Sequence, residues 1–247
     1  MAKQRLDVTM VERGLAESRE RAQALILAGQ VRVGSQPAPK PGTSIAADAL
    51  IEVIGNSCPW VSRGGLKLVG ALDTFGINPQ GGVALDVGAS TGGFTDVLLS
   101  RGVLKVYAID VGKAQLHWKL RQDTRVISME GVNARFLGEL ALPEPVDITV
   151  IDVSFISLDK ILPALPSHLK PGCEVVSLVK PQFEAGPRDV GKGGIVRDEG
   201  VRQRVMDSVM SVATKVGYEV LGRCESPIRG TEGNVEFFLH LRWGGPR

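Results

Sequence analysis

Cysteine, aromatic side chains and net charge are all scarce in this chain of 247 residues. Its three cysteines, Cys58, Cys173 and Cys224, are far apart, odd in number and match no metal-ligand spacing. We therefore expect free thiols in a reducing cytosol, with neither a disulfide framework nor a metal site. A formal net charge of +2 is too small to indicate nucleic-acid binding by itself, so any case for RNA depends on local features.

Long hydrophobic segments are missing as well. No stretch approaches the roughly 18 apolar residues that are needed to cross a bilayer. Residues 1–7 also lack the apolar core of a signal peptide. These absences predict a cytoplasmic protein that does not contact a membrane, and no feature indicates an obligatory protein partner.

The most informative segment that is present covers residues 83–97. The apolar run Val83–Val87 leads into the turn Gly88-Ala89-Ser90-Thr91-Gly92-Gly93, and helix-like sequence follows. Glycine accepts backbone geometries that a side chain forbids, so a ligand can approach such a turn closely. Twenty-two residues after Gly88, Asp110 ends the next apolar run, where a carboxylate suits bonding to both hydroxyls of a ribose. The pattern predicts a site for an adenosine-containing cofactor.

Two details favour S-adenosylmethionine over a dinucleotide. Turns that bind pyrophosphate carry G-x-G-x-x-G, whereas Ser90 stands here at the second glycine position. Asp86, just before the turn, would repel a pyrophosphate but could accept a hydrogen bond from an ammonium group. S-adenosylmethionine carries a sulfonium and an amino group and no phosphate, so it fits better. Asn133 is a further candidate for the adenine pocket, with a simple loop cap as the alternative.

The residues that we expect to bind the cofactor are Asp86, Gly88, Ala89, Ser90, Thr91, Gly92, Gly93, Asp110, Val111, Asn133 and Asp152.

The composition of the chain changes near residue 60. Before it, Thr9 and Glu12 have the spacing of a capping box, which predicts a helix over residues 9–14. The further elements expected here are a helix over 18–28 and strands over 31–33 and 50–53. So few short elements predict a small α+β module with little core.

From about residue 61, expected strands and helices alternate. The strands are 83–87, 106–110, 125–129, 147–152, 174–180, 218–224 and 236–241. The helices are 65–75, 94–101, 113–121, 158–169 and 201–216. Short buried strands with helices between them predict a mostly parallel, doubly wound sheet. A loop separates the last two strands, which predicts an antiparallel edge. The expected fold class is therefore α/β, with a Rossmann-like seven-stranded methyltransferase sheet.

Charged side chains stand at the ends of three of these strands. Asp152 ends the fourth strand, Lys180 ends the fifth, and Glu236 opens the last. Ligands of doubly wound folds bind outside the carboxyl ends of the strands, so Asp152 and Lys180 should face the same crevice as the glycine turn. An antiparallel last strand would bring Glu236 to that edge. A single charge at a strand end is usually solvated, but several that converge indicate a site.

Together the motifs of this chain resemble the TlyA family. They are Ser62–Leu68, the turn Asp86–Gly93, Ile151–Phe155, Val179–Glu184, Gly191–Asp198 and the segment Ser226–Glu236. Proteins of this family join an S4 RNA-binding domain to a methyltransferase domain similar to the FtsJ type. The resemblance covers essentially the whole chain and implies an S4-like domain over 1–57, a connector over 58–61 and a methyltransferase domain over 62–247.

The same resemblance implies an activity and its machinery. The activity is S-adenosylmethionine-dependent 2′-O-methylation of a cytidine ribose in ribosomal RNA, 23S or 16S or both, in the assembled ribosomal subunit. The FtsJ-like Lys-Asp-Lys-Glu tetrad maps onto Lys67, Asp152, Lys180 and Glu236. Lys180 would orient the ribose hydroxyl or accept its proton, and Asp152 would position that lysine. Lys67 and Glu236 would hold the acceptor ribose, and which lysine acts as base stays open.

The S4-like module carries the expected contacts to RNA. The basic residues proposed to meet phosphates are Arg5, Arg19, Arg21, Arg32 and, after the connector, Arg63. The alternative for Arg63 is a cap of the helix that carries Lys67. The alternative for the module is a solvated helix surface, since acidic residues are interleaved with the basic ones. The connector departs from the family because Cys58 and Pro59 replace the basic residue that often precedes its Trp-Val pair.

Three other functions compete with the methyltransferase. One is a haemolysin or other membrane-active protein, a label that this family has often carried. Another is a non-catalytic RNA-binding factor of the S4 type, against which the intact tetrad argues. A nicotinamide dehydrogenase is the weakest, because the turn lacks the pyrophosphate pattern.

Overall fold

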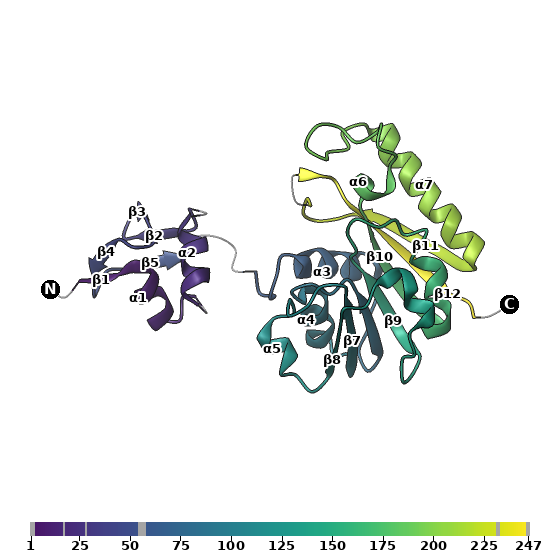
Figure 1. Ribbon diagram of the computed structural model, residues 1–247, viewed down its shortest axis with the longest axis horizontal. Helices are drawn as coiled ribbons and strands as arrows, with labels where there is room; N and C mark the ends of the chain where they lie inside the picture. Colours follow the sequence, from purple (N-terminus) through teal and green to yellow (C-terminus); the bar gives the residue numbers. More distant parts are fainter. Residues whose placement is uncertain (1–2, 17, 28, 54–57, 231–232, 246–247) are drawn as a thin grey trace. The chain divides into compact units, whose positions relative to one another are not determined.

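A computed structural model describes the chain apart from residues 1–2, 17, 28, 54–57, 231–232 and 246–247 (Figure 1). The chain divides into two compact units, Met1–Pro59 and Trp60–Arg247. Each unit has its own hydrophobic core.

The N-terminal unit is small and α+β, as its composition predicted. Its elements are β1 (Lys3–Arg5), α1 (Leu6–Glu12), α2 (Arg19–Leu27), β2 (Val31–Val33), β3 (Gln36–Pro37), β4 (Ser44–Ala46) and β5 (Ile51–Val53). β1 pairs with β4, and β2 lies between β3 and β5 in a second sheet. The two expected strands thus pair with each other antiparallel.

The predicted capping box at Thr9 is wrong. α1 begins at Leu6, so Thr9 lies inside the helix, where its hydroxyl donates to the backbone oxygen of Arg5 at 2.9 Å. Buried Leu6 and Met10 sit four residues apart on one helix face and pack into the core of this unit. Burial of that face sets where the helix starts, and the local capping pattern does not.

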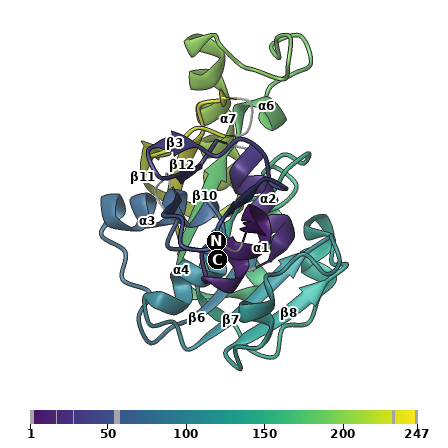
Figure 2. The ribbon, with the colours of Figure 1, turned by 90° about the vertical axis from the view of Figure 1, so that its left-hand side faces the viewer.

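The second unit contains a seven-stranded sheet, which confirms the predicted fold class. Its strands are β6 (Val83–Val87), β7 (Lys105–Asp110), β8 (Val126–Glu130), β9 (Val146–Ile151), β10 (Leu169–Val179), β11 (Tyr218–Glu225) and β12 (Phe237–Trp243). The spatial order is β11-β12-β10-β9-β6-β7-β8, and Figure 2 shows β6, β7 and β8 side by side. β12 is antiparallel to both of its neighbours, as predicted, and lies one strand inside the edge.

Helices cover both faces of this sheet. The elements are α3 (Gly64–Phe75), α4 (Gly93–Ser100), α5 (Trp118–Arg121), α6 (Pro181–Glu184), α7 (Glu199–Val216) and the 3-10 segments η1 (Ala134–Glu139), η2 (Leu162–Ala164) and η3 (Pro166–His168). Residues of α3 and α4 pack on one face with Phe238 of β12. Residues of α7 pack on the other face with Leu239. Alternation along β12 therefore places Glu236 on the α3 side and Phe237 on the α7 side.

Two of the predicted helices are largely absent. Residues 158–169 form only 3-10 turns, because Pro163 and Pro166 lack the backbone N–H that a continuing α-helix needs. Of residues 113–121 only Trp118–Arg121 is helical. The His117 N–H instead donates to the backbone oxygen of Thr91, which ties this segment to the glycine turn.

Candidate functional site

The turn between β6 and α4 brings backbone very close to backbone. Gly88 has φ +87°, and a Cβ there would lie 2.5 Å from the backbone oxygen of Asp152. A Cβ on Gly93 would lie 2.2 Å from the Ser62 hydroxyl oxygen. Ser90 also takes a positive φ, of 48°, which is uncommon for a residue with a side chain. Only glycine fits at Gly88 and Gly93, so the turn packs directly against the segments that carry Asp152 and Ser62.

Asp110 closes the turn from the neighbouring strand. One of its carboxylate oxygens accepts the N–H of Ser90 at 2.8 Å, and the other accepts the N–H of Gly112 at 2.7 Å. Both oxygens keep a second lone pair that is not used by these bonds. The carboxylate is thus held in a fixed orientation at the carboxyl end of β7.

A pocket of about 560 Å³ lies beside this turn. Of the expected cofactor residues, it is lined by Gly88, Ser90, Asp110, Val111, Asn133 and Asp152. Asn133 also caps η1, since its side-chain oxygen accepts the N–H of Arg135 at 3.0 Å. Asn133 thus caps η1 and also lines the pocket.

Asp86 and Gly92 line neither this pocket nor its neighbour. Asp86 is fully buried, and one of its oxygens accepts the Thr95 hydroxyl at 2.6 Å. Burial raises the pKa of Asp86 to about 7, and the charges of Asp152 and Asp110 act in the same direction. Gly92 has φ +95°, and a Cβ there would meet a Leu120 methyl group at 2.2 Å. Both residues pack beneath the turn, outside the linings of the two pockets.

A second pocket of about 330 Å³ adjoins the first. The expected residues that line it are Arg63, Lys67, Gly88, Ala89, Ser90, Thr91, Gly93, Asp152 and Lys180. The two pockets share Gly88, Ser90, Asp152 and Ser154. A ligand in one pocket therefore lies next to a ligand in the other.

Two lysine–carboxylate pairs meet at this second pocket. The ammonium nitrogen of Lys180 lies 2.5 Å from an Asp152 carboxylate oxygen and 2.9 Å from the Ser154 hydroxyl. The ammonium nitrogen of Lys67 lies 2.6 Å from a Glu236 carboxylate oxygen. The lysine side chains are 11% and 12% exposed, so both are mostly withdrawn from water while still lining the pocket.

Glu236 does not line either pocket and reaches the site through Lys67. Its side chain is 2% exposed, and Gly230 packs so closely that a Cβ there would lie 2.2 Å from a carboxylate oxygen. Lys67 stands in the first turn of α3, and Asp152 and Lys180 directly follow β9 and β10. Residues far apart in sequence thus converge because the strands end at one edge of the sheet.

Ser154 and Phe155 are site residues that the sequence interpretation passed over. Ser154 is the hydroxyl partner of Lys180 and lies two residues beyond Asp152, within a motif that already pointed to this loop. Phe155 is 90% exposed and has φ +62°, a rare conformation for an aromatic residue. Its ring lies 4.8 Å from that of Phe183, beside the Lys180 side chain.

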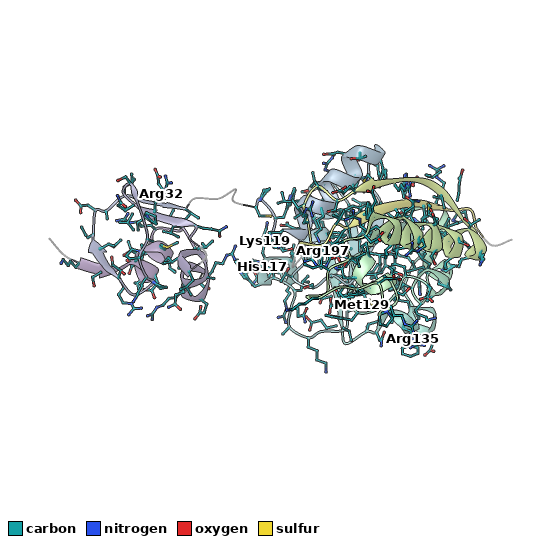
Figure 3. The ribbon with its side chains drawn as sticks, turned by 90° about the horizontal axis from the view of Figure 1, so that it is seen from above. Arg32, His117, Lys119, Met129, Arg135 and Arg197 are labelled. Carbon is teal, nitrogen blue, oxygen red and sulfur yellow. The ribbon has the colours of Figure 1, made fainter. Side chains whose placement is uncertain are left out.

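In the N-terminal unit the arginines proposed to bind phosphates differ in their partners. Arg5 and Arg19 both pair with the buried carboxylate of Asp7 at 2.9 Å, and their side chains are about half exposed. Arg21 is exposed on α2. Arg32 is exposed on β2 (Figure 3). Arg5 and Arg19 are therefore oriented by the fold, whereas Arg21 and Arg32 extend into solvent.

Some features are absent from the part of the chain that the structure describes. It contains no helix with the length and apolar character needed to span a bilayer. Nor do its described His, Cys, Asp and Glu side chains gather in a group of three that could hold a metal ion.

Comparison with known proteins places this architecture in a class. Residues 60–243 match the FtsJ-like methyltransferase family and residues 4–51 match the S4 domain. The fold and these matches define a methyltransferase of the FtsJ-like class that carries an S4 domain.

Individual relatives narrow the class further. The chain is 48% identical to the 16S/23S rRNA (cytidine-2′-O)-methyltransferase TlyA of Mycobacterium tuberculosis, over 96% of this chain and 89% of that protein. A solved structure described as a hemolysin from Streptococcus thermophilus is 45% identical, with a TM-score of 0.76, and covers 100% of this chain and 90% of that one. The N-methyltransferase NodS of Bradyrhizobium japonicum, solved with S-adenosyl-L-homocysteine, shares only the fold, at 13% identity and a TM-score of 0.52 over 78% of this chain and 94% of that one. The chain belongs to the TlyA family.

Proposed function

We propose that this protein transfers a methyl group from S-adenosylmethionine to the ribose 2′-oxygen of a cytidine in ribosomal RNA. The observation that carries the proposal is the pair of lysine–carboxylate contacts at a pocket that shares its wall with the pocket beside the glycine turn. The 48% identity to a 16S/23S rRNA (cytidine-2′-O)-methyltransferase supports the choice of substrate.

The larger pocket is suited to S-adenosylmethionine. Asp110 and Asp152 line this pocket. Asp110 would bind the ribose hydroxyls of the cofactor, and Asp152 would add a negative charge toward a cationic ligand. Gly88 lines this pocket and carries no side chain into it. The volume of about 560 Å³ lies within the usual range for small-molecule sites. When bound, this cofactor supplies a methyl group on a positively charged sulfur.

The smaller pocket would receive the acceptor ribose. Lys180 donates to the Ser154 hydroxyl at 2.9 Å, and its side-chain nitrogen lies 2.5 Å from an Asp152 carboxylate oxygen. To act as the base, Lys180 would react as the neutral amine, whose nitrogen lone pair accepts a hydrogen bond from the ribose 2′-hydroxyl. That nitrogen would take the hydroxyl proton as the new carbon–oxygen bond forms, and Asp152 would balance the charge of the resulting ammonium group.

Lys67 and Glu236 would complete the acceptor site. Lys67 lines the pocket, and Glu236 fixes the lysine side chain from behind. Holding two reactants in line converts a bimolecular step into an effectively unimolecular one, which is a large part of the rate enhancement for such a transfer. The two ion pairs thus have different tasks: one acts on the proton and the other on the position of the ribose.

The N-terminal unit would deliver the RNA. We assign the S4-like domain to residues 1–57, the connector to 58–61 and the methyltransferase domain to 62–247. Arg5, Arg19, Arg21, Arg32 and Arg63 are the proposed phosphate contacts, which would act in a salt-dependent and largely sequence-independent way. A ribosomal RNA substrate is consistent with a cytoplasmic location.

The test is transfer of a tritiated methyl group to purified ribosomal subunits. We expect label in RNA with the unaltered protein and none with Lys180→Ala. The matched control is Lys160→Ala, because Lys160 is half exposed, pairs with Asp159 and lines neither pocket. No label with the unaltered protein on either subunit, together with haemolysis that survives Lys180→Ala, would favour the membrane-active alternative instead.

A further inference from the structure

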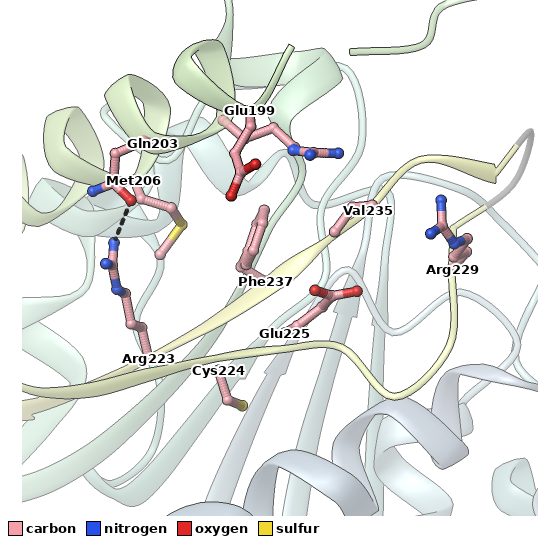
Figure 4. Close-up of a pocket in the computed structure, with 10 residues that line it drawn as sticks. Glu199, Gln203, Met206, Arg223, Cys224, Glu225, Arg229, Val235 and Phe237 are labelled. Carbon is pink, nitrogen blue, oxygen red and sulfur yellow. Dashed lines mark hydrogen bonds between the residues drawn. The ribbon is translucent and has the colours of Figure 1, made fainter. Parts of the chain in front are cut away.

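A separate pocket of about 410 Å³ lies between α7 and the end of β11 and start of β12 (Figure 4). Phe237 points into this pocket, whereas Glu236 points to the opposite face of the sheet and pairs with Lys67. Phe237 is paired in register with Val179, and Lys180 is the next residue. The pocket is therefore at the same edge of the sheet as the two lysines, on its other face.

Charges of both signs surround the pocket. Arg202, Arg223 and Arg229 line it together with Glu199 and Glu225. Arg223 donates to the side-chain oxygen of Gln203 at 3.2 Å, and Arg229 donates to the backbone oxygen of Gly233 at 3.3 Å. Within the ranges of the chain that the structure describes, the side chains of Arg202, Glu199 and Glu225 form no hydrogen bond or ion pair. Donors and acceptors thus remain available to a ligand.

The inner wall of the pocket is apolar. Met206 and Val235 are buried, and the ring of Phe237 is partly exposed between them (Figure 4). An aromatic ring beside unpaired charges of both signs is unsuited to a purely aliphatic ligand or to a simple anion. It suits a planar group that carries hydrogen-bond donors and an attached anion.

We propose that this pocket binds a second, unpaired nucleotide of the substrate RNA, close in the strand to the nucleotide that is methylated. The base would stack on Phe237, as bases of single-stranded RNA stack on aromatic side chains. Glu225 or Glu199 would accept a hydrogen bond from an exocyclic amine of the base, and the arginines would hold the phosphate. The volume is sufficient for one small ligand.

This inference rests on the proposed function and adds a determinant of sequence to it. Phosphate contacts position an RNA without reading it, whereas an acceptor aimed at a base amine discriminates between bases. An amine is present on cytosine, adenine and guanine and absent from uracil. We therefore expect the pocket to disfavour uridine at this position of the substrate.

The first test compares Arg202→Ala combined with Arg229→Ala against the control Arg204→Ala. Arg204 lies on the same helix and is not among the residues that line the pocket. We expect the double variant to raise KM for the ribosomal subunit about tenfold, with the affinity for S-adenosylmethionine unchanged. An unchanged KM would overturn the proposal. A different result would overturn the proposed function itself, namely that the unaltered protein transfers no methyl group.

The second test identifies what enters the pocket. Gln203, which lines it and is exposed, is replaced by a photo-crosslinking amino acid (Gln203→p-benzoylphenylalanine), and the protein is irradiated on a ribosomal subunit. We expect a crosslink to ribosomal RNA within a few nucleotides of the methylated ribose. A crosslink to a ribosomal protein, or no crosslink, would contradict the assignment of an RNA nucleotide to this pocket.

Discussion

The two units of this protein each bury one aspartate completely, but they surround it differently. Asp7 in the N-terminal unit accepts hydrogen bonds from Arg5, Arg19 and Gln23. Asp86 in the methyltransferase unit accepts hydrogen bonds from the hydroxyl and the backbone N–H of Thr95, and among the described residues no cation pairs with it. The small unit thus uses ion pairs to hold its fold together. The large unit keeps its buried lysine pairs at the pocket, where they can act on a substrate.

This contrast shows that ion pairs of similar length can have different roles in one protein. The Arg5–Asp7 pair joins two elements of a module with little apolar core, at a distance of 2.9 Å. The Lys180–Asp152 pair, at 2.5 Å, lines a pocket and contributes to no core. Removal of the first should therefore lower stability, and removal of the second should abolish chemistry.

The largest effect is expected for Lys180→Ala. Loss of the group that handles the hydroxyl proton should lower kcat by about 10³-fold. The affinity for S-adenosylmethionine, measured by calorimetry, should stay close to that of the unaltered protein. Near-normal turnover in this variant would show that Lys180 has no part in the reaction.

The next effect concerns the pH dependence of stability that Asp86 causes. Its pKa is raised from 3.8 to about 7 in the folded state, so the folded protein binds a proton that the unfolded chain has released. The free energy of unfolding should therefore fall as pH rises from about 4 to about 7 and level off above that. The difference between a pKa of 3.8 and a pKa of about 7 corresponds to about 4 kcal/mol.

The variant that isolates this contribution is Asp86→Asn, with Asp73→Asn as an exposed control. Denaturant unfolding at pH 5 and pH 8 should show that Asp86→Asn stabilises the protein more at pH 8 than at pH 5. An equal effect at both pH values would mean that Asp86 is ionised in the folded protein across this range.

A smaller effect is expected for Asp7→Ala, which removes the shared partner of the N-terminal cations. The pairing with Arg5 holds the pKa of Asp7 well below its usual range, so its contribution to stability is present near neutral pH and is lost in strong acid. We expect a loss of about 2 kcal/mol at pH 7. The rate of hydrogen exchange should rise in α1 and α2 and stay unchanged in β6 and β7. An equal change in all four elements would contradict the claim that Asp7 stabilises the N-terminal unit alone.

The smallest effect is expected from the exposed arginines. Arg21→Ala and Arg32→Ala should each remove about one phosphate contact. Each should therefore lower the slope of log K for RNA binding against log salt concentration by about one. Arg125→Ala serves as the control, because Arg125 pairs with Asp123 just before β8 begins and lines neither pocket, which lie beyond the carboxyl ends of the strands. A salt slope that stays the same in both variants would remove the N-terminal unit from the RNA interface.

The sequence predicted most of the sheet, because buried strands are apolar runs with a clear end. The strand 83–87 agrees with the structure at both ends. The helix expected over 158–169 was wrong, although Pro163 and Pro166 were visible signals against it. Local patterns thus predicted an element correctly where the apolar run and the turn residues beside it agreed. The helix prediction failed because it relied on a periodic apolar pattern that two prolines interrupt.

The site was only partly predictable for a different reason. The expectation that Lys67, Asp152, Lys180 and Glu236 act together came from a family resemblance, whereas their division into two pairs required the folded positions of α3 and β12. Nothing in the residue pattern indicated that Asp86 is buried beneath the turn. Ser154 was missed because its role depends on one contact with Lys180.

The most direct measurement of the central claim is nucleoside analysis of ribosomal RNA after reaction with the purified protein. The RNA is digested and the modified nucleoside is identified by mass spectrometry. The account predicts 2′-O-methylcytidine with the unaltered protein and with Lys160→Ala, and none with Lys180→Ala. A methyl group on the base, or the same product from Lys180→Ala, would contradict it.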